Sequence, residues 1–383
     1  MKQLHGREAV GQHLYIHVPF CDGKCAYCAF YSERYAWERA NRYLDALDTE
    51  ASIRFNETEA APETIYVGGG TPSILNAAQL APVRRIVTER PALRDRREWT
   101  VEANPGTLSP EKLRVLRDAG VNRISLGVQS FDDALLHRIG RRPSAAAVGE
   151  TVPAIRNAGI ANIGLDLIAA LPGADDANWL ATLQKAVEIG PQHISAYALT
   201  VEQGSRLAAL AETGRLISPT ADAQLRALDQ AEQALTAAGY VRYEISNYAK
   251  PGFEAKHNLS CWRGEDYLGL GPAASSRVGL KRWTNQPSIE QYVEALAAGH
   301  LPPRDEETVS PDTDAAERLV FAFRLAEGVD LETYAAIPGS RPDQWMKTLE
   351  RLATDGLTEA RHGRWHLTPR GCDLADFVAA ELL

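Results

Sequence analysis

Residues 13–32 of the 383-residue chain, HLYIHVPFCDGKCAYCAFYS, decide the fold. An extended apolar segment, residues 13–20, runs directly into Cys21, Cys25 and Cys28 at the spacing C-x-x-x-C-x-x-C. Three of the five cysteines therefore lie within eight residues. A closed structural metal site uses four protein ligands, whereas an open site leaves one position for another molecule. The stretch predicts a strand that leads into a metal site one ligand short.

The extended segment is the first of six that alternate with helical stretches. The predicted strands span residues 13–20, 63–70, 98–105, 123–130, 162–172 and 193–202. Between them, apolar residues recur at the i, i+3, i+4, i+7 spacing of an amphipathic helix, and several stretches close on Gly. This alternation is typical of a parallel α/β sheet or barrel. Six units instead of eight predict an open, partial (β/α)6 barrel.

Polar residues gather at the carboxyl ends of these predicted strands. The cysteines follow the first strand, Gly68 to Thr71 end the second, and Glu102 with Asn104, Gln129, and Tyr197 end later ones. The βα loops of such barrels converge at this edge and build the active site there. We therefore expect the functional site at the carboxyl edge. Asp166, within the fifth strand, and Gln129 are expected to offer polar contacts in an otherwise apolar barrel interior.

The alternation stops near residue 243, and the rest of the chain predicts two further parts. Residues 243–300, which carry HNLSCW at 257–262, are rich in aromatics, Gly and Asn, and predict an irregular segment laid on the barrel of residues 1–242. After a Pro-rich and acidic linker at 301–314, helices near 314–326 and 341–355, a hairpin, and a helix at 373–382 predict a small winged-helix-like α+β domain over 301–383. Its acidic helices argue against reading DNA.

Composition limits the function further. The chain is 45% hydrophobic and 24% charged, with a net charge of -9, which argues against a broad nucleic-acid-binding surface. The first residues lack the pattern of a secretory leader, and no run is long and apolar enough for a membrane anchor. Clustered cysteines fit a reducing compartment. We expect a cytoplasmic protein that does not bind nucleic acid.

Three cysteine thiolates can bind three irons of a 4Fe-4S cluster and leave the fourth iron open. Two other readings remain for the cysteines alone: a zinc site completed by a nearby histidine such as His17, or buried structural thiols.

Five motifs together resemble one known family: YIHVPFCDGKCAYCAF, GGGTPS, VEANP, GVQSF and HNLSCW. In this order they resemble the radical S-adenosylmethionine (SAM) proteins related to oxygen-independent coproporphyrinogen III oxidase, a family with a haem-chaperone branch. The resemblance covers nearly the whole chain, including the small C-terminal domain. It implies that Cys21, Cys25 and Cys28 hold a 4Fe-4S cluster, and that SAM binds the open iron through its amine and carboxylate.

The resemblance also implies a set of SAM-binding positions. They are Tyr15, Tyr27, Gly69, Gly70, Thr71, Glu102, Gln129, Arg141, Asp166 and Ala198. Glycines lack a Cβ and let a backbone approach a ligand closely, a carboxylate such as Glu102 can accept from an ammonium or a ribose hydroxyl, and an arginine can grip a carboxylate. Arg142 is a competing candidate beside Arg141.

Two departures from the oxidase point to the haem-chaperone branch. Phe30 stands where the oxidase has another cysteine, and only a dozen residues precede the first strand. The chaperone signature H-N-x-x-Y-W is present as HNLSCW, in which Cys261 replaces the tyrosine. This implies His257 as a haem ligand and Trp262 as a flat apolar face, while Cys261 is either a soft ligand or a small buried side chain.

We therefore expect a haem chaperone that binds a 4Fe-4S cluster, SAM and haem, and passes haem to an acceptor protein such as a respiratory enzyme. One alternative is a radical enzyme that abstracts hydrogen from a tetrapyrrole propionate, and another is a zinc-bound scaffold without turnover. A homodimer and a peripheral membrane contact are left open by the sequence.

Overall fold

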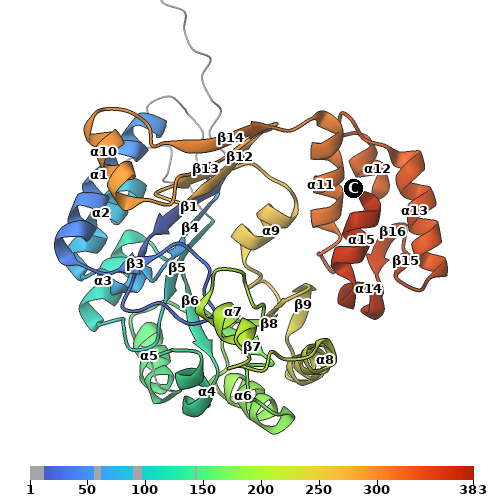
Figure 1. Ribbon diagram of the computed structural model, residues 1–383, viewed down its shortest axis with the longest axis horizontal. Coiled ribbons are helices and arrows are strands. Elements are labelled where there is room, and N and C mark those ends of the chain that lie inside the picture. The colour runs from blue at the N-terminus through green and yellow to red at the C-terminus, as the bar shows by residue number, and fades with distance from the viewer. Residues whose placement is uncertain (1–12, 56–61, 89–96, 143–144) are drawn as a thin grey trace, which may run out of the picture.

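The structure is a computed structural model, and it describes residues 13–55, 62–88, 97–142 and 145–383 (Figure 1). The first twelve residues, on which the expectation of no secretory leader partly rests, lie outside the described residues. So do residues 89–90, at the end of the helical stretch predicted over 72–90, and residues 143–144, at the start of the one predicted over 143–160.

Six parallel strands form the centre of the protein, as predicted. Hydrogen bonds join them in chain order. Their bounds are β1 His13–Val18, β4 Thr64–Gly69, β5 Glu98–Ala103, β6 Arg123–Gln129, β7 Asn162–Ala169 and β8 His193–Ala198. Short connections β2 (Phe20–Cys21) and β3 (Glu33–Arg34) lie just beyond the end of β1. The partial (β/α)6 barrel is confirmed.

Helices connect these strands, and most of them lie against the sheet on its outer side (Figure 1). They are α1 Trp37–Phe55, η1 Pro72–Ile74, α2 Ala77–Thr88, α3 Pro110–Ala119, α4 Asp133–Arg138, α5 Ala145–Asn157, α6 Asp176–Ile189, α7 Arg206–Glu212 and α8 Ala221–Ala237. Their ends follow local chemistry: Ser109 caps α3 at Lys112 N, and Gly120 takes the left-handed conformation that ends it. Apolar strand residues such as Ile16, Val67 and Leu126 face these helices and form the main core.

The inner face of the sheet is polar, contrary to the expected apolar interior. Because side chains alternate along a strand, the residues between the core positions point inward. They include Tyr15, His17, Thr64, Tyr66, Glu98, Thr100, Glu102, Arg123, Ser125, Asp166, His193 and Ser195. The prediction failed because the apolar core lies between sheet and helices, which leaves the inner face free for polar groups.

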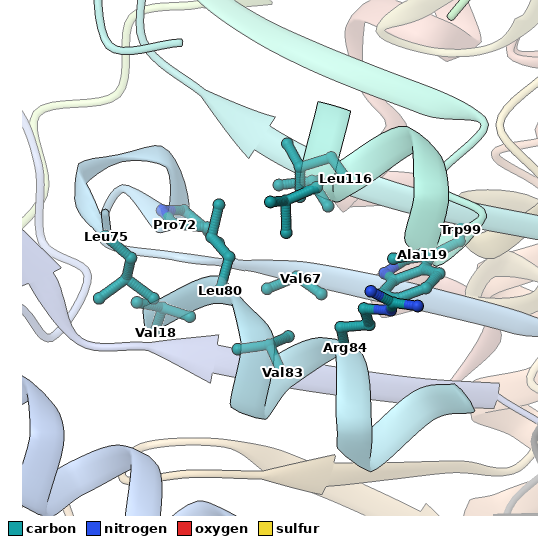
Figure 2. A pocket seen from close by; sticks show the side chains of 12 residues that line it. Val18, Val67, Pro72, Leu75, Leu80, Val83, Arg84, Trp99, Leu116 and Ala119 are labelled. Atoms are coloured by element: carbon teal, nitrogen blue, oxygen red, sulfur yellow. The ribbon is translucent and has the colours of Figure 1, made fainter. Parts of the chain in front are cut away.

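One small apolar cavity lies within this outer core and not at the carboxyl edge. Val18, Val67, Leu80, Val83 and Leu116 are among the residues that surround it, between the sheet and helices α2 and α3 (Figure 2). Its volume is about 10 Å³, which is room for one water at most. It is therefore a packing void and not a binding site.

Residues 241–308, which include the segment predicted to be irregular, extend the sheet at both edges. The strands are β9 Val241–Glu244, β10 Asn247–Ala249, β11 Tyr267–Leu270, β12 Ser275–Val278, β13 Lys281–Asn285 and β14 Arg304–Thr308. β10 pairs with β8, while β11 lies parallel to β1, and β12 to β14 follow it. Helices α9 (Lys256–Trp262) and α10 (Ile289–Ala297) lie between these strands.

The prediction of an irregular segment and of a linker at 301–314 was therefore wrong in secondary structure. Each of these strands has only three to five residues, too few to show a strand period in the sequence. They are held by pairing with distant residues, as Tyr267 is with His13. The edge strand β14 is acidic and exposed, which is what made it resemble a linker.

The C-terminal part is a separate helical cluster with a hairpin, as predicted for a winged-helix-like domain. Its elements are α11 Pro311–Ala322, α12 Leu331–Ala335, α13 Pro342–Thr354, β15 Thr358–Arg361, β16 Arg364–Leu367, α14 Pro369–Asp373 and α15 Ala375–Leu382. Leu319, Trp345, Leu349, Leu352 and Val378 belong to its own apolar core. It lies beside the sheet extension, beyond α9 (Figure 1).

Buried ion pairs fasten this part to the sheet. Arg277 of β12 pairs with Asp314 of α11, and their side chains are only 8% and 7% exposed. Arg324 reaches the buried carboxylate of Glu244 at 3.4 Å. Because a buried charge without its partner is costly, these contacts fix where the C-terminal part sits.

Candidate cluster and ligand site

The three clustered cysteines lie on one loop beyond the carboxyl end of β1. Each is free and partly exposed. Backbone bonds pin the loop: Ala26 N donates to Ile139 O at 2.8 Å and accepts at its carbonyl from Leu207 N at 2.7 Å. The thiols therefore project from a backbone that is already fixed. Burial raises the pKa of the Cys28 thiol, and the neighbouring Cys25 and Cys21 raise it further.

A chain of polar side chains connects Cys21 to Cys25. Thr71 Oγ1 lies 3.5 Å from Cys21 Sγ and accepts from Asn104 Nδ2 at 3.1 Å. Asn104 Oδ1 accepts from Arg141 Nη2 at 2.8 Å, and Arg141 Nη1 lies 3.7 Å from Cys25 Sγ. Tyr27, between the cysteines, also hydrogen-bonds to Cys25, and burial raises the pKa of its phenol.

The glycine run at the end of β4 is required by protein packing. A Cβ on Gly70 would lie 2.5 Å from the carbonyl oxygen of Phe20, and one on Gly69 would lie 2.6 Å from the His17 ring. Gly70 N and Thr71 N instead donate to Val18 O and Phe20 O at 2.9 and 2.7 Å. The run thus fastens β4 to the strand that carries the cysteines, a role that the sequence did not reveal.

Glu102 lies against the glycine run. Its oxygens accept from Tyr66 Oη at 2.7 Å and from Gly69 N at 3.2 Å. Burial raises the pKa of Glu102 to about 7, against the opposing effect of the Tyr66 hydrogen bond, and the negative charge of Asp166 adds to the rise. This carboxyl group therefore changes charge near neutral pH.

Asp166 lies deeper, on the inner face of β7. It accepts from Ser195 Oγ at 2.8 Å and from Ser125 Oγ at 3.1 Å, which are hydroxyls of the two neighbouring strands. Burial raises its pKa too. Its hydrogen bonds hold it between the strands, as in a structural acid.

The other predicted SAM positions lie on the same side of the barrel. The Tyr15 hydroxyl lies 2.9 Å from His17 Nδ1, within hydrogen-bond distance, inside the barrel. Ala198 is the last residue of β8. Gln129 ends β6 with φ of 68°, at a register shift between β6 and β7. Arg142, by contrast, pairs with Asp22 on the surface. The fold therefore favours Arg141 over Arg142 as a site residue.

The zinc alternative finds no support in the position of His17. Both ring nitrogens of His17 are used, Nδ1 by Tyr15 and Nε2 by the Tyr31 carbonyl at 2.9 Å. Among the described residues, no three His, Cys, Asp or Glu side chains are arranged to hold a single metal ion. A four-iron cluster distributes its cysteine ligands over separate irons, so three soft thiols on one pinned loop fit a cluster.

His257 lies at the opposite end of the strands. Its Nδ1 is 2.8 Å from the hydroxyl of Thr64, the first residue of β4, and its backbone N donates to Glu98, the first residue of β5. The ring stacks on Tyr66, with 5.2 Å between centroids. Burial lowers the pKa of His257 to about 3, so the imidazole is neutral. No hydrogen bond to its Nε2 is found within the described part of the chain.

Cys261 and Trp262 complete α9. Burial raises the pKa of Cys261 to about 11, so its thiol is protonated at neutral pH. Trp262 lies under the guanidinium of Arg324, 4.3 Å from its ring centroid, and beside Phe321. Trp262, Phe321 and Arg324 border an apolar pocket of about 210 Å³ against α11 and α15. The HNLSCW motif therefore extends from the amino ends of β4 and β5, where His257 lies, to the C-terminal part, which Trp262 contacts.

Arg123 and Thr64 were absent from the sequence-based set, and Asn104 was named there only as a polar residue at a predicted strand end, without a role. The alternation of a strand places Asn104 on the same face as Glu102, so this signal was available. Arg123 is a buried cation among Glu98, Tyr66 and Asp166 on the inner face, and Thr64 meets His257 across 193 residues of chain. Neither contact leaves a trace in the local sequence.

The chain is similar to known proteins over both of its parts. Residues 15–186 match the radical SAM superfamily, and residues 309–374 match the HemN C-terminal domain. Among its relatives, the heme chaperone HemW of Mycobacterium tuberculosis H37Rv is 36% identical over 97% of this chain and 94% of its own length. HemW of Bacillus subtilis is 34% identical over 96% and 98%, and that of Escherichia coli 37% over 94% of both.

Among solved structures, coproporphyrinogen III oxidase (HemN) of Escherichia coli has the same fold. Its TM-score is 0.81 at 23% identity, over 98% of this chain and 90% of that one. The matched relatives, with the radical SAM barrel and the HemN-type C-terminal part, place this chain in the HemW family of radical SAM proteins.

Proposed function

We propose that the protein is a haem chaperone that holds a 4Fe-4S cluster, SAM and haem, and passes haem to an acceptor protein. The names of its relatives support this, since they are described as heme chaperones at 34–37% identity over nearly the whole chain. The site geometry supports two binding regions, one at each end of the barrel strands.

The carboxyl edge is the proposed cluster and SAM region. Cys21, Cys25 and Cys28 hold the cluster, Glu102 provides a carboxylate for the ammonium of SAM, and Arg141 provides a cation for its carboxylate. When bound and reduced, such a cluster supplies one electron to the SAM sulfonium. The neighbouring proposed contacts are Tyr15, Tyr27, Gly69, Gly70, Thr71, Gln129, Asp166 and Ala198.

The state of His257 carries the haem proposal. Ligand histidines in proteins usually hydrogen-bond through the second ring nitrogen, which fixes the ring and leaves the first nitrogen for the metal. His257 has this arrangement, with Nδ1 held by Thr64 at 2.8 Å and a neutral ring. Cys261 is a poorer ligand because its thiol is protonated at neutral pH. Since His257 is only 7% exposed, haem binding requires α9 to open.

The two regions lie at opposite ends of β4. β4 runs from Thr64, beside His257, to Gly69, beside Glu102, and five steps of roughly 3.3 Å separate these ends by about 17 Å. Tyr66 fills the space between them, because its ring stacks on His257 and its hydroxyl donates to Glu102 at 2.7 Å. This side chain keeps a tetrapyrrole held by His257 from the cysteine loop, which favours a carrier of haem over an enzyme that abstracts hydrogen from a tetrapyrrole.

The acceptor is proposed to be a haem protein such as a respiratory enzyme, reached in the cytoplasm by a protein that acts alone or as a homodimer. No helix among the described residues is both long enough and apolar enough to cross a membrane.

Anaerobic reconstitution with iron and sulfide, followed by titration with haem, tests the proposal. We expect a brown cluster spectrum that is lost when Cys21, Cys25 and Cys28 are replaced by alanine. We also expect a stable haem spectrum that weakens in His257→Ala but persists in Cys261→Ser, a matched change on the same helix. The haem-loaded protein should then lose its haem spectrum to an apo-haem protein.

Three results would contradict the proposal. Release of 5'-deoxyadenosine together with decarboxylated product from coproporphyrinogen III, SAM and reductant would show the radical enzyme instead. One bound zinc and no cluster absorption would show the scaffold. Equal haem affinity in wild type and His257→Ala would remove His257 as the ligand.

A further inference from the structure

Asn104 lies in the middle of the chain of polar side chains that connects Cys21 to Cys25. Its amide nitrogen donates to Thr71, whose hydroxyl lies 3.5 Å from Cys21 Sγ. Its amide oxygen accepts from Arg141, whose other terminal nitrogen lies 3.7 Å from Cys25 Sγ. The orientation of the amide is fixed, because the opposite one would set its NH₂ against the guanidinium, which has only donors.

The neighbouring strand, β6, is shaped to admit the guanidinium of Arg141. A Cβ on Gly127 would lie 2.8 Å from Arg141 Nη2 and 3.3 Å from Asn104 Oδ1. Arg141 Nη2 also donates to the Gly127 carbonyl oxygen. Glycine at this position of β6 therefore makes the space in which Arg141 and Asn104 meet. The guanidinium stays positively charged, because arginine does not lose its proton in proteins.

We propose that Asn104 is a positioning residue that sets the reduction potential of the cluster, by holding Arg141 beside Cys25 and the Thr71 hydroxyl beside Cys21. The inference rests on the proposed function, because it requires the cluster. Net charge and hydrogen bonds to the cysteine sulfurs control the potentials of iron–sulfur clusters. A cation and a hydroxyl at two ligand sulfurs stabilise the reduced cluster, which carries one more negative charge, and so raise the potential.

Redox titration of the reconstituted protein, followed by electron paramagnetic resonance, measures this effect. In Asn104→Leu, which keeps the approximate volume but removes both hydrogen bonds, the potential becomes more negative. At a fixed solution potential the ratio of reduced to oxidised cluster falls about tenfold, equivalent to about 59 mV for one electron. The added methyl group of Gly127→Ala meets Arg141 most closely and then Gln129 and Asn104, but no cysteine, so it displaces Arg141 and shifts the potential in the same direction.

Ser73→Ala is the matched control. Ser73 Oγ accepts from the backbone N of Asn104 at 3.2 Å and does not reach the Arg141 or Thr71 side chains. The reduction potential of the cluster in Ser73→Ala stays at the wild-type value. In an Arg141→Gln background, the shift caused by Asn104→Leu shrinks, because residues that act through one contact are not additive.

An unchanged potential in both Asn104→Leu and Gly127→Ala would overturn the inference while the proposed function stands. An equal shift in Ser73→Ala would also overturn it, since the loop and not the side chain would then be responsible. A wild-type protein that takes up no cluster would refute the proposed function itself, and this inference with it.

Discussion

Glu102→Gln tests the charge in the proposed SAM site. The Glu102 side chain accepts from Tyr66 and from Gly69 N, and burial raises its pKa to about 7. A carboxylate can accept a hydrogen bond from a ligand ammonium with full charge only after it has lost its proton. The affinity for SAM should therefore rise with pH through about 7, in the direction opposite to the protonation of Glu102.

The expected magnitudes follow from this pKa. With a midpoint of 7, roughly 10% of Glu102 is ionised at pH 6 and roughly 90% at pH 8, so the affinity falls about tenfold between pH 8 and pH 6. Glutamine keeps the shape but carries no charge. A hydrogen bond to a charged group contributes about 1.5–3 kcal/mol, so Glu102→Gln should bind SAM about 10- to 150-fold more weakly at pH 8.

Calorimetry of SAM binding to the reconstituted protein at pH 6, 7 and 8 measures both effects. The ratio of wild-type to Glu102→Gln affinity cancels the titration of the ligand itself. Tyr66→Phe is a second check. The Tyr66 hydrogen bond lowers the pKa of Glu102, so its removal should move the midpoint to higher pH.

A wild-type to Glu102→Gln ratio that is the same at pH 6 and pH 8 would refute the reasoning. It would show that Glu102 does not carry charge to the ligand, even if SAM binds.

Three further outcomes are expected from single substitutions. In the haem titration, His257→Ala should lose haem affinity, and Thr64→Val should lose less because it frees the ring without removing it; equal loss in both would count against direct coordination. Asp314→Asn leaves a buried guanidinium without its counter-charge and should lower the free energy of unfolding by about 3–5 kcal/mol in urea denaturation, and a change below about 1 kcal/mol would contradict the buried ion pair. Gly70→Ala should reduce the iron content after reconstitution because its Cβ would lie 2.5 Å from the backbone that leads to the cysteines, whereas Gly149→Ala, with no atom within 4 Å, should keep it.

Much of the barrel was predictable from local patterns. Each of the six central strands was visible as a short apolar run between helical stretches, and the cysteines and Glu102 fell at the predicted edge. This works because strand ends and helix periods are properties of consecutive residues. The shorter strands β9 to β14 were not predictable, because they are stabilised by pairing with residues far away in the chain.

The sequence by itself determined the three cysteines, their spacing, the partial barrel and the family motifs, since these depend on neighbouring residues. Only the tertiary structure decided that Asn104 connects Thr71 to Arg141, and that His257 rests on Thr64 at the far end of the strands from the cysteines. Such contacts join residues 33 to 193 positions apart. They exist only after the strands have aligned, because the fold and not the local sequence sets which side chains share one face.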